Sequence, residues 1–262
     1  WFDAICHVDT VDANAWIGRL TYPLTMATDR NSYLQEAKAT GLVVLRRTLM
    51  SDRLTPVLAY RSLVRDDDRM APSFLFESVE QGGGAARVGR TSILGAAPRL
   101  EVVARGRSVR VIDHVEGTRV ETVEEDPLEL PRRLAADRPL ATPAEELPDC
   151  FTGGWVGYVG YDSVRWLEPE KLPVGSAPRD DRGLPDMHLG LYEEVVVFDH
   201  VSKVIEVMVL SDPTRHDGPE AAHDDAADRL ESLVRRLTGE TVHLAPGVVD
   251  LDVAPDEVFL LD

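Results

Sequence analysis

A glycine-rich segment, residues 151–165, constrains the fold of this chain more than any other part of its sequence. It reads FTGGWVGYVGYDSVR, in which four glycines are interleaved with aromatic side chains. A glycine inside a strand packs no side chain, so repeated glycine indicates that another backbone segment or a ligand comes close. Asp162 or Ser163 is suited to cap a short helix directly afterwards. The segment therefore predicts a tight strand that runs into a helix.

Strand and helix signals alternate without a regular rhythm along the rest of the chain. Helices are expected at four places, residues 29–39, 55–64, 126–136 and 217–238. Strands are expected over residues 42–49, 73–79, 88–94, 100–104, 108–112, 189–199 and 203–210. Because hairpins exclude a purely parallel sheet, the pattern predicts an α+β fold with mainly antiparallel, sandwich-like sheets and flanking helices.

The charge balance excludes two classes of partner. The chain has 28 Lys and Arg against 46 Asp and Glu, which gives a formal net charge of −18. Nucleic acids and anionic membrane surfaces are bound by clustered basic residues, so neither partner is expected. The apolar runs, such as residues 195–198, are far too short to cross a bilayer. The two cysteines, Cys6 and Cys150, favour a reducing compartment.

Residue spacing assigns neither a catalytic residue nor a metal site. The seven histidines form no pair at the i,i+4 spacing of helical metal ligands, and His200 is interpreted as a turn residue. In so acidic a chain, the pair Glu193-Glu194 is interpreted as solvated surface. The run Gly82–Gly84 lacks a following Gly-Lys-Ser/Thr and is interpreted as a connector rather than a phosphate loop.

The run Leu75-Phe76-Glu77-Ser78 is a candidate edge for binding an amino acid. Strand alternation places Leu75 and Glu77 on one face, and Phe76 and Ser78 on the other. A strand end offers backbone N–H groups beside the carboxylate and the hydroxyl, which suits an ammonium and a carboxylate group. By its chemistry alone, however, the run is more simply explained as a plain structural strand.

Several motifs resemble the N-terminal half of the anthranilate synthase large subunit, particularly its plant and algal form. The matching segments are DRLTPVLAY (52–60), PSFLFESVE (72–80), the glycine-rich segment, LPDMHLGLY (184–192) and VVVFDHVSK (195–203). They are long and non-repetitive, and they occur in the order that the family has. The resemblance implies an N-terminal extension over residues 1–40 and a component I N-terminal domain over 41–240. It also implies a tail, 241–262, that leads toward a chorismate-binding catalytic domain absent from this sequence.

The resemblance implies a regulatory role in the first committed step of tryptophan biosynthesis. The family's enzyme converts chorismate and glutamine into anthranilate, pyruvate and glutamate, and tryptophan inhibits it. The implied inhibitor site comprises Phe76, Glu77 and Ser78, supported by Arg90. The family usually has Gly-Arg-Tyr-Ser around that arginine, and here Thr91 replaces the aromatic residue.

The same resemblance places the chemistry outside this sequence. Mg²⁺ and the acid–base residues belong to the catalytic half, so no catalytic residue, metal ligand or cofactor is assigned to this chain. The chain alone is expected to be inactive. A glutamine amidotransferase subunit and L-tryptophan are the implied partners. The implied location is the chloroplast stroma for a plant or algal protein, and the cytoplasm otherwise.

Two other functions remain open. The chain resembles the corresponding part of aminodeoxychorismate synthase as well, although the intact Glu77-Ser78 pair and the match over residues 184–203 favour anthranilate synthase. A non-catalytic tryptophan-binding module is the second alternative, and it would be preferred if the gene ends at Asp262.

Overall fold

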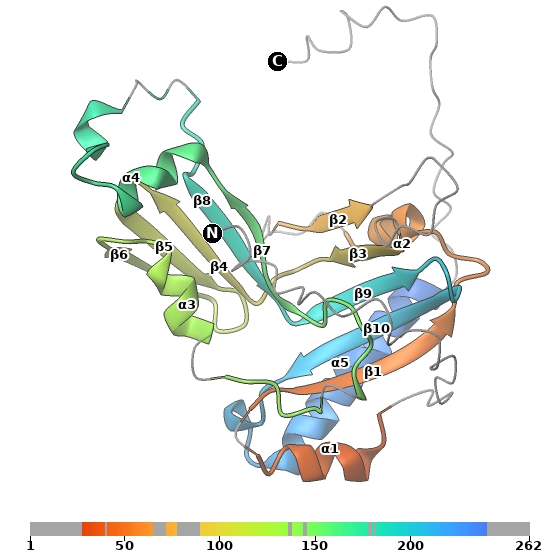
Figure 1. Cartoon of the computed structure of the whole chain (residues 1–262). Helices are drawn as coiled ribbons and strands as arrows, with labels where there is room; N and C mark the ends of the chain where they lie inside the picture. Colours follow the sequence, from red (N-terminus) through yellow and green to blue (C-terminus); the bar gives the residue numbers. More distant parts are fainter. Residues whose placement is uncertain are drawn as a thin grey trace, which may run out of the picture.

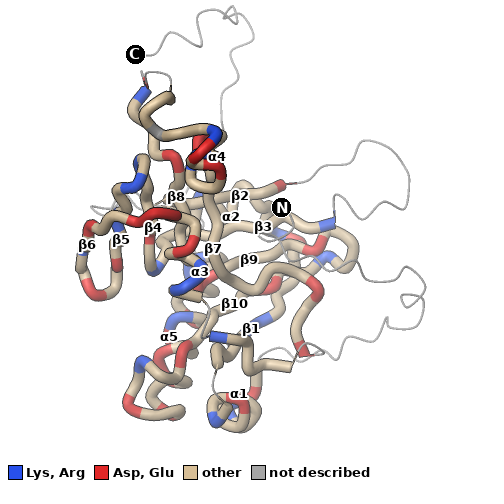
Figure 2. The backbone as a smooth tube through the Cα atoms, turned by 60° about the vertical axis from the view of Figure 1, so that its left-hand side comes forward, with Lys and Arg blue, Asp and Glu red and all other residues tan. Residues whose placement is uncertain are grey.

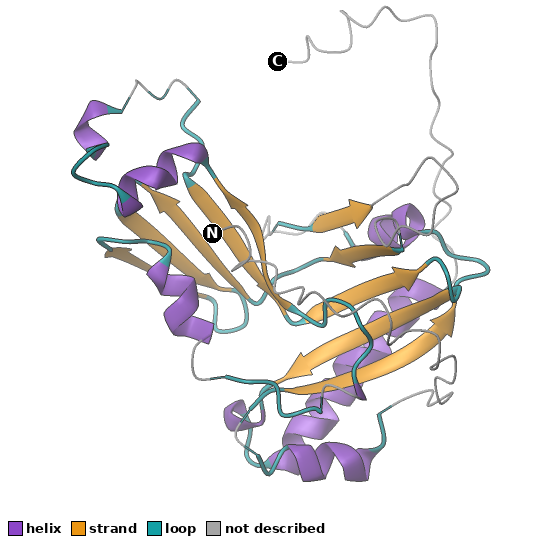
Figure 3. Cartoon of the chain, in the orientation of Figure 1, coloured by secondary structure: helices purple, strands orange, loops and turns teal. Residues whose placement is uncertain are grey.

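Two five-stranded β-sheets with helices packed against them form the described part of this chain (Figure 1). The computed structural model describes residues 28–39, 41–64, 72–77, 90–135, 138–143, 146–177, 180 and 182–239. Every pair of neighbouring strands within the two sheets is antiparallel, and helices flank both sheets (Figure 3). The predicted α+β class with mainly antiparallel sheets is therefore confirmed.

The first sheet joins strands that are far apart in the sequence, in the order β1-β10-β9-β3-β2. Its strands are β1 (Val43–Met50), β2 (Phe74–Glu77), β3 (Thr91–Gly95), β9 (Glu194–Asp199) and β10 (Val204–Ser211). The second sheet has the order β6-β5-β4-β8-β7. Its strands are β4 (Leu100–Arg105), β5 (Ser108–Asp113), β6 (Thr118–Val123), β7 (Gly154–Val159) and β8 (Met187–Tyr192).

The helices are short, apart from the last. The α-helices are α1 (Arg30–Glu36), α2 (Pro56–Leu63), α3 (Glu129–Ala135), α4 (Val164–Leu167) and α5 (Pro219–Thr238). Within the described residues, 3₁₀ turns occur at Tyr161–Ser163, Val174–Ser176 and Pro213–Arg215. No helix in the described part of the chain combines the length and the hydropathy that a membrane span requires.

Helix α5 lies across one face of the first sheet and buries the largest core (Figure 1). The apolar face expected at helical spacing is buried, with Val234 in addition: Ala222, Ala226, Leu230, Leu233 and Leu237. These side chains pack with inward-facing residues of β1, β9 and β10, among them Leu45, Val196 and Val207. The prediction of this helix from the 3.6-residue period is confirmed.

The other face of the first sheet meets the second sheet. Val44, Val195 and Met208 of the first sheet form a buried cluster with Tyr192 of β8, and Val156 of β7 packs against it. A separate core lies on the far side of the second sheet, where Trp166 of α4 covers Val102, Val109 and Met187 among other residues. The two sheets thus share one apolar layer, and each has a second layer of its own.

Two neighbouring strands pass from one sheet into the other at the same place. β3 and β9 pair in the first sheet, and their continuations β4 and β8 pair in the second sheet. The crossings occur at residues 96–99 and at Glu193. Ala97 has a positive φ of 54°, which is unusual for a residue with a side chain and marks a sharp turn of the backbone. The single strand expected over residues 189–199 is therefore wrong, because it is two strands in two sheets.

Helix starts were predicted with mixed success. Thr55 caps α2 as expected, since its side chain accepts a hydrogen bond from the N–H of Leu58 at 3.3 Å. Ser163, one of the two expected caps, does precede α4 at the N-cap position, but its side chain forms no capping hydrogen bond. The 3₁₀ turn before α4 begins after Gly160 and has no side-chain cap either. β6 was not predicted, because its side chains are almost all polar or exposed and show no alternation.

The glycine-rich segment forms β7, as its composition indicates, and its glycines admit close backbone contacts. A Cβ atom at Gly157 would lie 2.0 Å from the carbonyl oxygen of His188 on the neighbouring strand β8. Gly153 has a φ of 130°, which an L side chain rarely adopts. The close neighbour at Gly157 is thus a backbone segment rather than a ligand.

Gly157→Ala is expected to destabilise the fold, because the added methyl group must push β7 away from β8. Overpacking of this kind costs about 1–3 kcal/mol, which lowers the midpoint of urea unfolding measurably. Gly175→Ala is the matched control, because an added Cβ there meets no atom within 4 Å. Equal unfolding midpoints for the two variants would contradict this account of β7.

Candidate functional site

Three of the four residues predicted to bind tryptophan lie at one end of the first sheet. Glu77 is the last residue of β2 and lies opposite Ser92 of β3. Arg90 directly precedes β3, so it lies at the same end of the sheet. Phe76 is 55% exposed. Ser78 lies outside the described residues. The structure therefore brings Phe76, Glu77 and Arg90 to one sheet end.

Alternation along β2 separates the candidate side chains onto two faces. Leu75 packs against the α5-side core, and Glu77 shares that face. Phe76 lies on the opposite face, where its ring centroid is 5.1 Å from that of Phe74. Phe74 in turn makes an edge-to-face contact with Tyr192 at 4.7 Å. Through these ring contacts, the exposed Phe76 side chain extends the apolar layer between the two sheets to the surface.

Arg90 is held by the end of β9. Its guanidinium donates from Nε and Nη2 to Oδ2 of Asp199, at 3.2 and 2.7 Å. Burial raises the pKa of Asp199, but the hydrogen bonds from Arg90 and from the N–H of Ser202 outweigh it, and the pKa lies below its usual value. The carboxylate is therefore charged at neutral pH, and it fixes where Arg90 lies.

His200 lies in the turn between β9 and β10, as expected from the sequence. Its Nε2 is 2.7 Å from the hydroxyl oxygen of Ser92, and its backbone N–H donates to the carbonyl of Arg90 at 2.8 Å. No local pattern indicates the contact between Ser92 and His200, because these two residues are 108 positions apart.

A carboxylate with two histidines lies on the second sheet, away from the predicted residues. Glu101 of β4 is 5% exposed, and its two oxygens accept hydrogen bonds from Nε2 of His114 and of His188, both at 2.5 Å. The ring of His188 meets that of Tyr158 from the glycine-rich strand at 6.4 Å. Burial raises the pKa of Glu101, but the two histidine hydrogen bonds outweigh it and lower the pKa overall.

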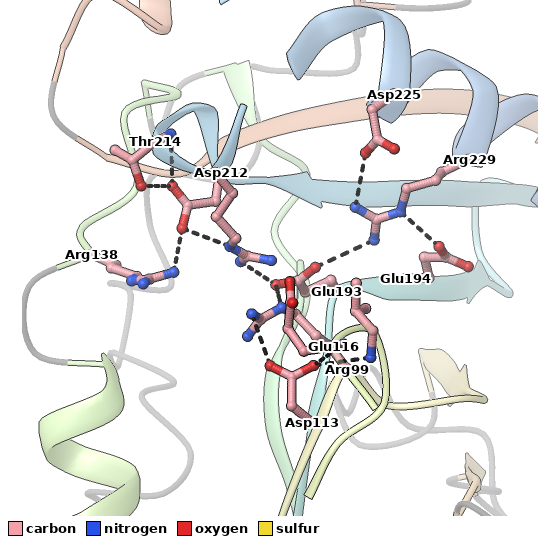
Figure 4. Close-up of polar contacts among 12 residues, drawn as sticks. Arg99, Asp113, Glu116, Arg138, Glu193, Glu194, Asp212, Thr214, Asp225 and Arg229 are labelled. Atoms are coloured by element: carbon pink, nitrogen blue, oxygen red, sulfur yellow. Dashed lines mark hydrogen bonds and ion pairs between the residues drawn. The ribbon is translucent and has the colours of Figure 1, made fainter. Parts of the chain in front are cut away.

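A network of ion pairs occupies the place where the strands cross between sheets (Figure 4). Glu193 is 7% exposed; it accepts a hydrogen bond from Arg215 at 2.5 Å and forms ion pairs with Arg229 at 3.5 Å and Arg99 at 3.8 Å. Arg99 also donates to Asp113 at 3.2 Å. The interpretation of Glu193 as solvated surface is wrong, because the side chain is buried and paired with arginines. The sequence did not reveal this, since those arginines come from distant segments.

Neither cluster is arranged to ligate a metal. Across the described ranges, no three His, Cys, Asp or Glu side chains are grouped so that they could hold a metal ion. Cys150 is partly buried, and burial raises the pKa of its thiol to about 12. A thiol with so high a pKa is a poor nucleophile at neutral pH.

Acidic residues are distributed over elements of both sheets rather than gathered on one element (Figure 2). The most buried of them are paired with arginine or histidine, as at Glu193 and Glu101. The sequence offered one signal for this. Glu101 interrupts the otherwise apolar run of β4, and a charge inside such a run indicates a paired, buried group.

Comparisons with known proteins find close relatives among anthranilate synthases. The chain is 47% identical over 232 residues to anthranilate synthase alpha subunit 1, chloroplastic, of Arabidopsis thaliana, which covers 87% of this chain and 38% of the relative. It is 48% identical over 219 residues to the rice subunit of the same name, from Oryza sativa subsp. indica, covering 83% and 38%. This chain is a homologue of the anthranilate synthase large subunit.

The homology extends to bacterial anthranilate synthases at lower identity. Component 1 of Thermus thermophilus is 38% identical over 199 residues, which covers 74% of this chain and 36% of the relative. A crystal structure of anthranilate synthase component I from Streptococcus pneumoniae superposes with a TM-score of 0.41 at 26% identity, covering 72% of this chain and 38% of that one. A scan against models of protein families finds no match.

The anthranilate synthase homologue thus spans a little over a third of the length of these relatives. Its plant relatives are more similar to it than the bacterial one, as the motifs indicated. The predicted resemblance to the plant form of the family is confirmed.

Glu101→Gln is expected to destabilise this anthranilate synthase homologue most at neutral pH. A hydrogen bond to a charged group contributes about 1.5–3 kcal/mol, and the variant weakens two of them. Because the pKa of Glu101 is lowered on folding, its stabilisation is present above the unfolded-state pKa and is lost as the pH falls through the folded-state pKa. The difference in unfolding free energy between wild type and variant should therefore shrink from pH 7 toward pH 3.

Urea unfolding at a series of pH values measures this difference. Glu121→Gln is the control, because Glu121 forms an exposed ion pair with Arg110 on the same sheet. Exposed pairs contribute about 0–1 kcal/mol, so this variant should stay close to wild type. If the loss of unfolding free energy in Glu101→Gln grew toward acid pH, Glu101 would not be a carboxylate whose pKa is lowered by its two histidine hydrogen bonds.

Glu193→Gln is expected to cost about 1.5–3 kcal/mol of unfolding free energy, because it removes the buried charge shared by three partly buried arginines, each of which keeps a second carboxylate partner. Glu231→Gln is the matched control, since Glu231 pairs with Arg47 at the surface and should contribute under about 1 kcal/mol. Thermal unfolding followed by circular dichroism measures both variants. Similar melting temperatures for the two variants would show that the corner, the place where residues 96–99 and Glu193 cross between the two sheets, does not depend on Glu193.

Proposed function

We propose that this chain is the N-terminal, tryptophan-sensing part of an anthranilate synthase large subunit of the plant type. The 47% identity to the Arabidopsis subunit over 232 residues carries the proposal. The complete subunit would convert chorismate into anthranilate and pyruvate, with nitrogen from glutamine. The relatives named above are all anthranilate synthases, which favours this function over aminodeoxychorismate synthase.

The chemistry would belong to the part of the subunit that follows this chain's counterpart in its relatives. Mg²⁺ would be bound there, and a glutamine amidotransferase subunit would supply ammonia to it. The names of the plant relatives include the word chloroplastic, which supports a plastid location for this protein. The role left to this chain is regulation.

The proposed inhibitor site combines Phe76, Glu77 and Arg90, which lie at one sheet end, with Ser78, the residue that follows Glu77 in the sequence. The Glu77 carboxylate would bind the ammonium group of tryptophan, and the Ser78 hydroxyl and backbone N–H groups would bind its carboxylate. Phe76 is exposed on the face of β2 opposite to Glu77, so an indole ring would contact it by extending around the end of the strand. Arg90 already shares its charge with Asp199, so it would support the site rather than bind the ligand alone.

Binding at this end would inhibit only if tryptophan distinguishes two states of the complete subunit, because a ligand shifts an equilibrium by its differential affinity alone. A site completed by the catalytic half supplies such a difference. Tryptophan would then favour the arrangement in which both parts contact it, and that arrangement would be the less active one.

Ser78→Phe tests this proposal in a chimera in which the chain replaces its counterpart in the Arabidopsis subunit. Anthranilate fluorescence measures the activity with chorismate, Mg²⁺ and ammonia. The substitution should leave that activity while raising the inhibition constant for tryptophan at least ten- to hundredfold. A lost hydrogen bond to a charged group already accounts for about 1.5–3 kcal/mol of that, and the ring adds a steric block.

Ser108→Phe is the matched control, because Ser108 is exposed at the start of β5 on the other sheet. It should leave both activity and inhibition unchanged. Equal inhibition constants for wild type and Ser78→Phe would overturn the proposed site. A folded wild-type chimera that makes no anthranilate would overturn the proposed enzyme.

A further inference from the structure

Three interactions connect the start of β3 to the end of β9. The guanidinium of Arg90 donates to the carboxylate of Asp199, with the closer contact at 2.7 Å. The backbone carbonyl of Arg90 accepts from the N–H of His200 at 2.8 Å. The hydroxyl of Ser92 lies 2.7 Å from Nε2 of His200. Asp199 at the end of β9 and His200 of the turn thus hold Arg90, which precedes β3, and Ser92 of β3.

The turn itself is fixed, so His200 is presented to Ser92 in one place. The second oxygen of Asp199 accepts hydrogen bonds from the N–H groups of Val201 at 2.9 Å and Ser202 at 3.1 Å. Lys203, which ends the turn, has a positive φ of 60°, as expected for a tight connection. A side chain mounted on so constrained a turn loses little further entropy when it forms its hydrogen bond.

The Ser92–His200 pair is not a nucleophile with its base. Ser92 is 1% exposed, and it lies on the α5-side face of the sheet, where Phe198 is its cross-strand neighbour. A substrate therefore has no approach to the hydroxyl. Both oxygens of the adjacent Asp199 are engaged by Arg90 and by the turn backbone, so they do not orient the imidazole as a catalytic carboxylate would.

The position of Glu77 depends on Ser92. β2 is an edge strand of four residues, and β3 is its sole strand neighbour in the described sheet. Glu77 pairs directly with Ser92 at the last position of that ladder. Movement of Ser92 would therefore displace Glu77, which has no second strand to hold it.

We propose that His200 is a positioning residue for the proposed tryptophan site, acting through Ser92 to hold Glu77 at the end of β2. This inference rests on the proposed function, since it concerns regulation through the same site. His200 does not touch the ligand in this account. It makes the end of β2 rigid, so that the Glu77 carboxylate is already in place when tryptophan binds. Less binding free energy is then lost in ordering that carboxylate.

Hydrogen exchange in the 262-residue chain tests the positioning step without any ligand. In His200→Ala, peptides that cover β2 should exchange about three- to tenfold faster than in wild type, because one net hydrogen bond of about 0.5–1.5 kcal/mol is lost. His200→Gln should restore slow exchange, since the glutamine amide reaches the position of Nε2. Val201→Ala is the control in the same turn, where the valine side chain is 74% exposed.

Inhibition in the full-length chimera tests the regulatory step with the same variants. His200→Ala should raise the inhibition constant for tryptophan about three- to tenfold and leave the KM for chorismate unchanged, and His200→Gln should return it to near the wild-type value. Ser92→Ala should weaken inhibition similarly, and adding His200→Ala to it should weaken it no further, because both substitutions remove one interaction.

The outcomes separate this inference from the function on which it rests. If wild type is inhibited and His200→Ala matches it in both exchange and inhibition, the positioning role is wrong. If His200→Gln is as impaired as His200→Ala, the side-chain hydrogen bond is not what holds the strand, and the inference is equally overturned. If wild-type chimera is not inhibited by tryptophan at all, the proposed function fails, and no residue can position its site.

Discussion

The carboxylate of Glu193 is the point on which the two sheets depend. Removing a charged group from water costs several kcal/mol unless partners replace the lost solvation. Here the partners come from both sides of the corner: Arg99 from the other strand crossing, Arg215 from the turn after β10, and Arg229 from α5. One buried charge thus holds both crossings and the longest helix in a single arrangement.

The corner and the proposed tryptophan site lie at opposite ends of β9. β9 begins beside Glu193 and ends at Asp199, which holds Arg90. At about 3.3 Å per residue, the two ends are roughly 17 Å apart. The strand is buried along most of its length and pairs on both sides, with β3 and with β10. It therefore gives the site a rigid base that is fixed by the corner.

Local patterns predicted much of the fold, and contacts between distant residues account for what they missed. The period of α5 and the proline-marked start of α2 are properties of neighbouring residues, so the sequence showed them. The break at Glu193 and the pairing of Glu101 with His188, 87 positions away, are properties of the folded chain. In the candidate site, the motif indicated Glu77 and Arg90, whereas the support from His200 required the strand register.

The pairing of β1 with β10 also sets how late in synthesis the first sheet can form. Leu45 lies opposite Val209, 164 positions later. At ~5–20 residues per second, synthesis reaches the partner residue on β10 about 8–33 s after β1, and α5, which covers β1, follows later. An apolar strand left alone for so long is prone to pair with other chains. Arg46 and Arg47 interrupt that strand, so the charges that join ion pairs in the finished sheet also keep the nascent strand soluble.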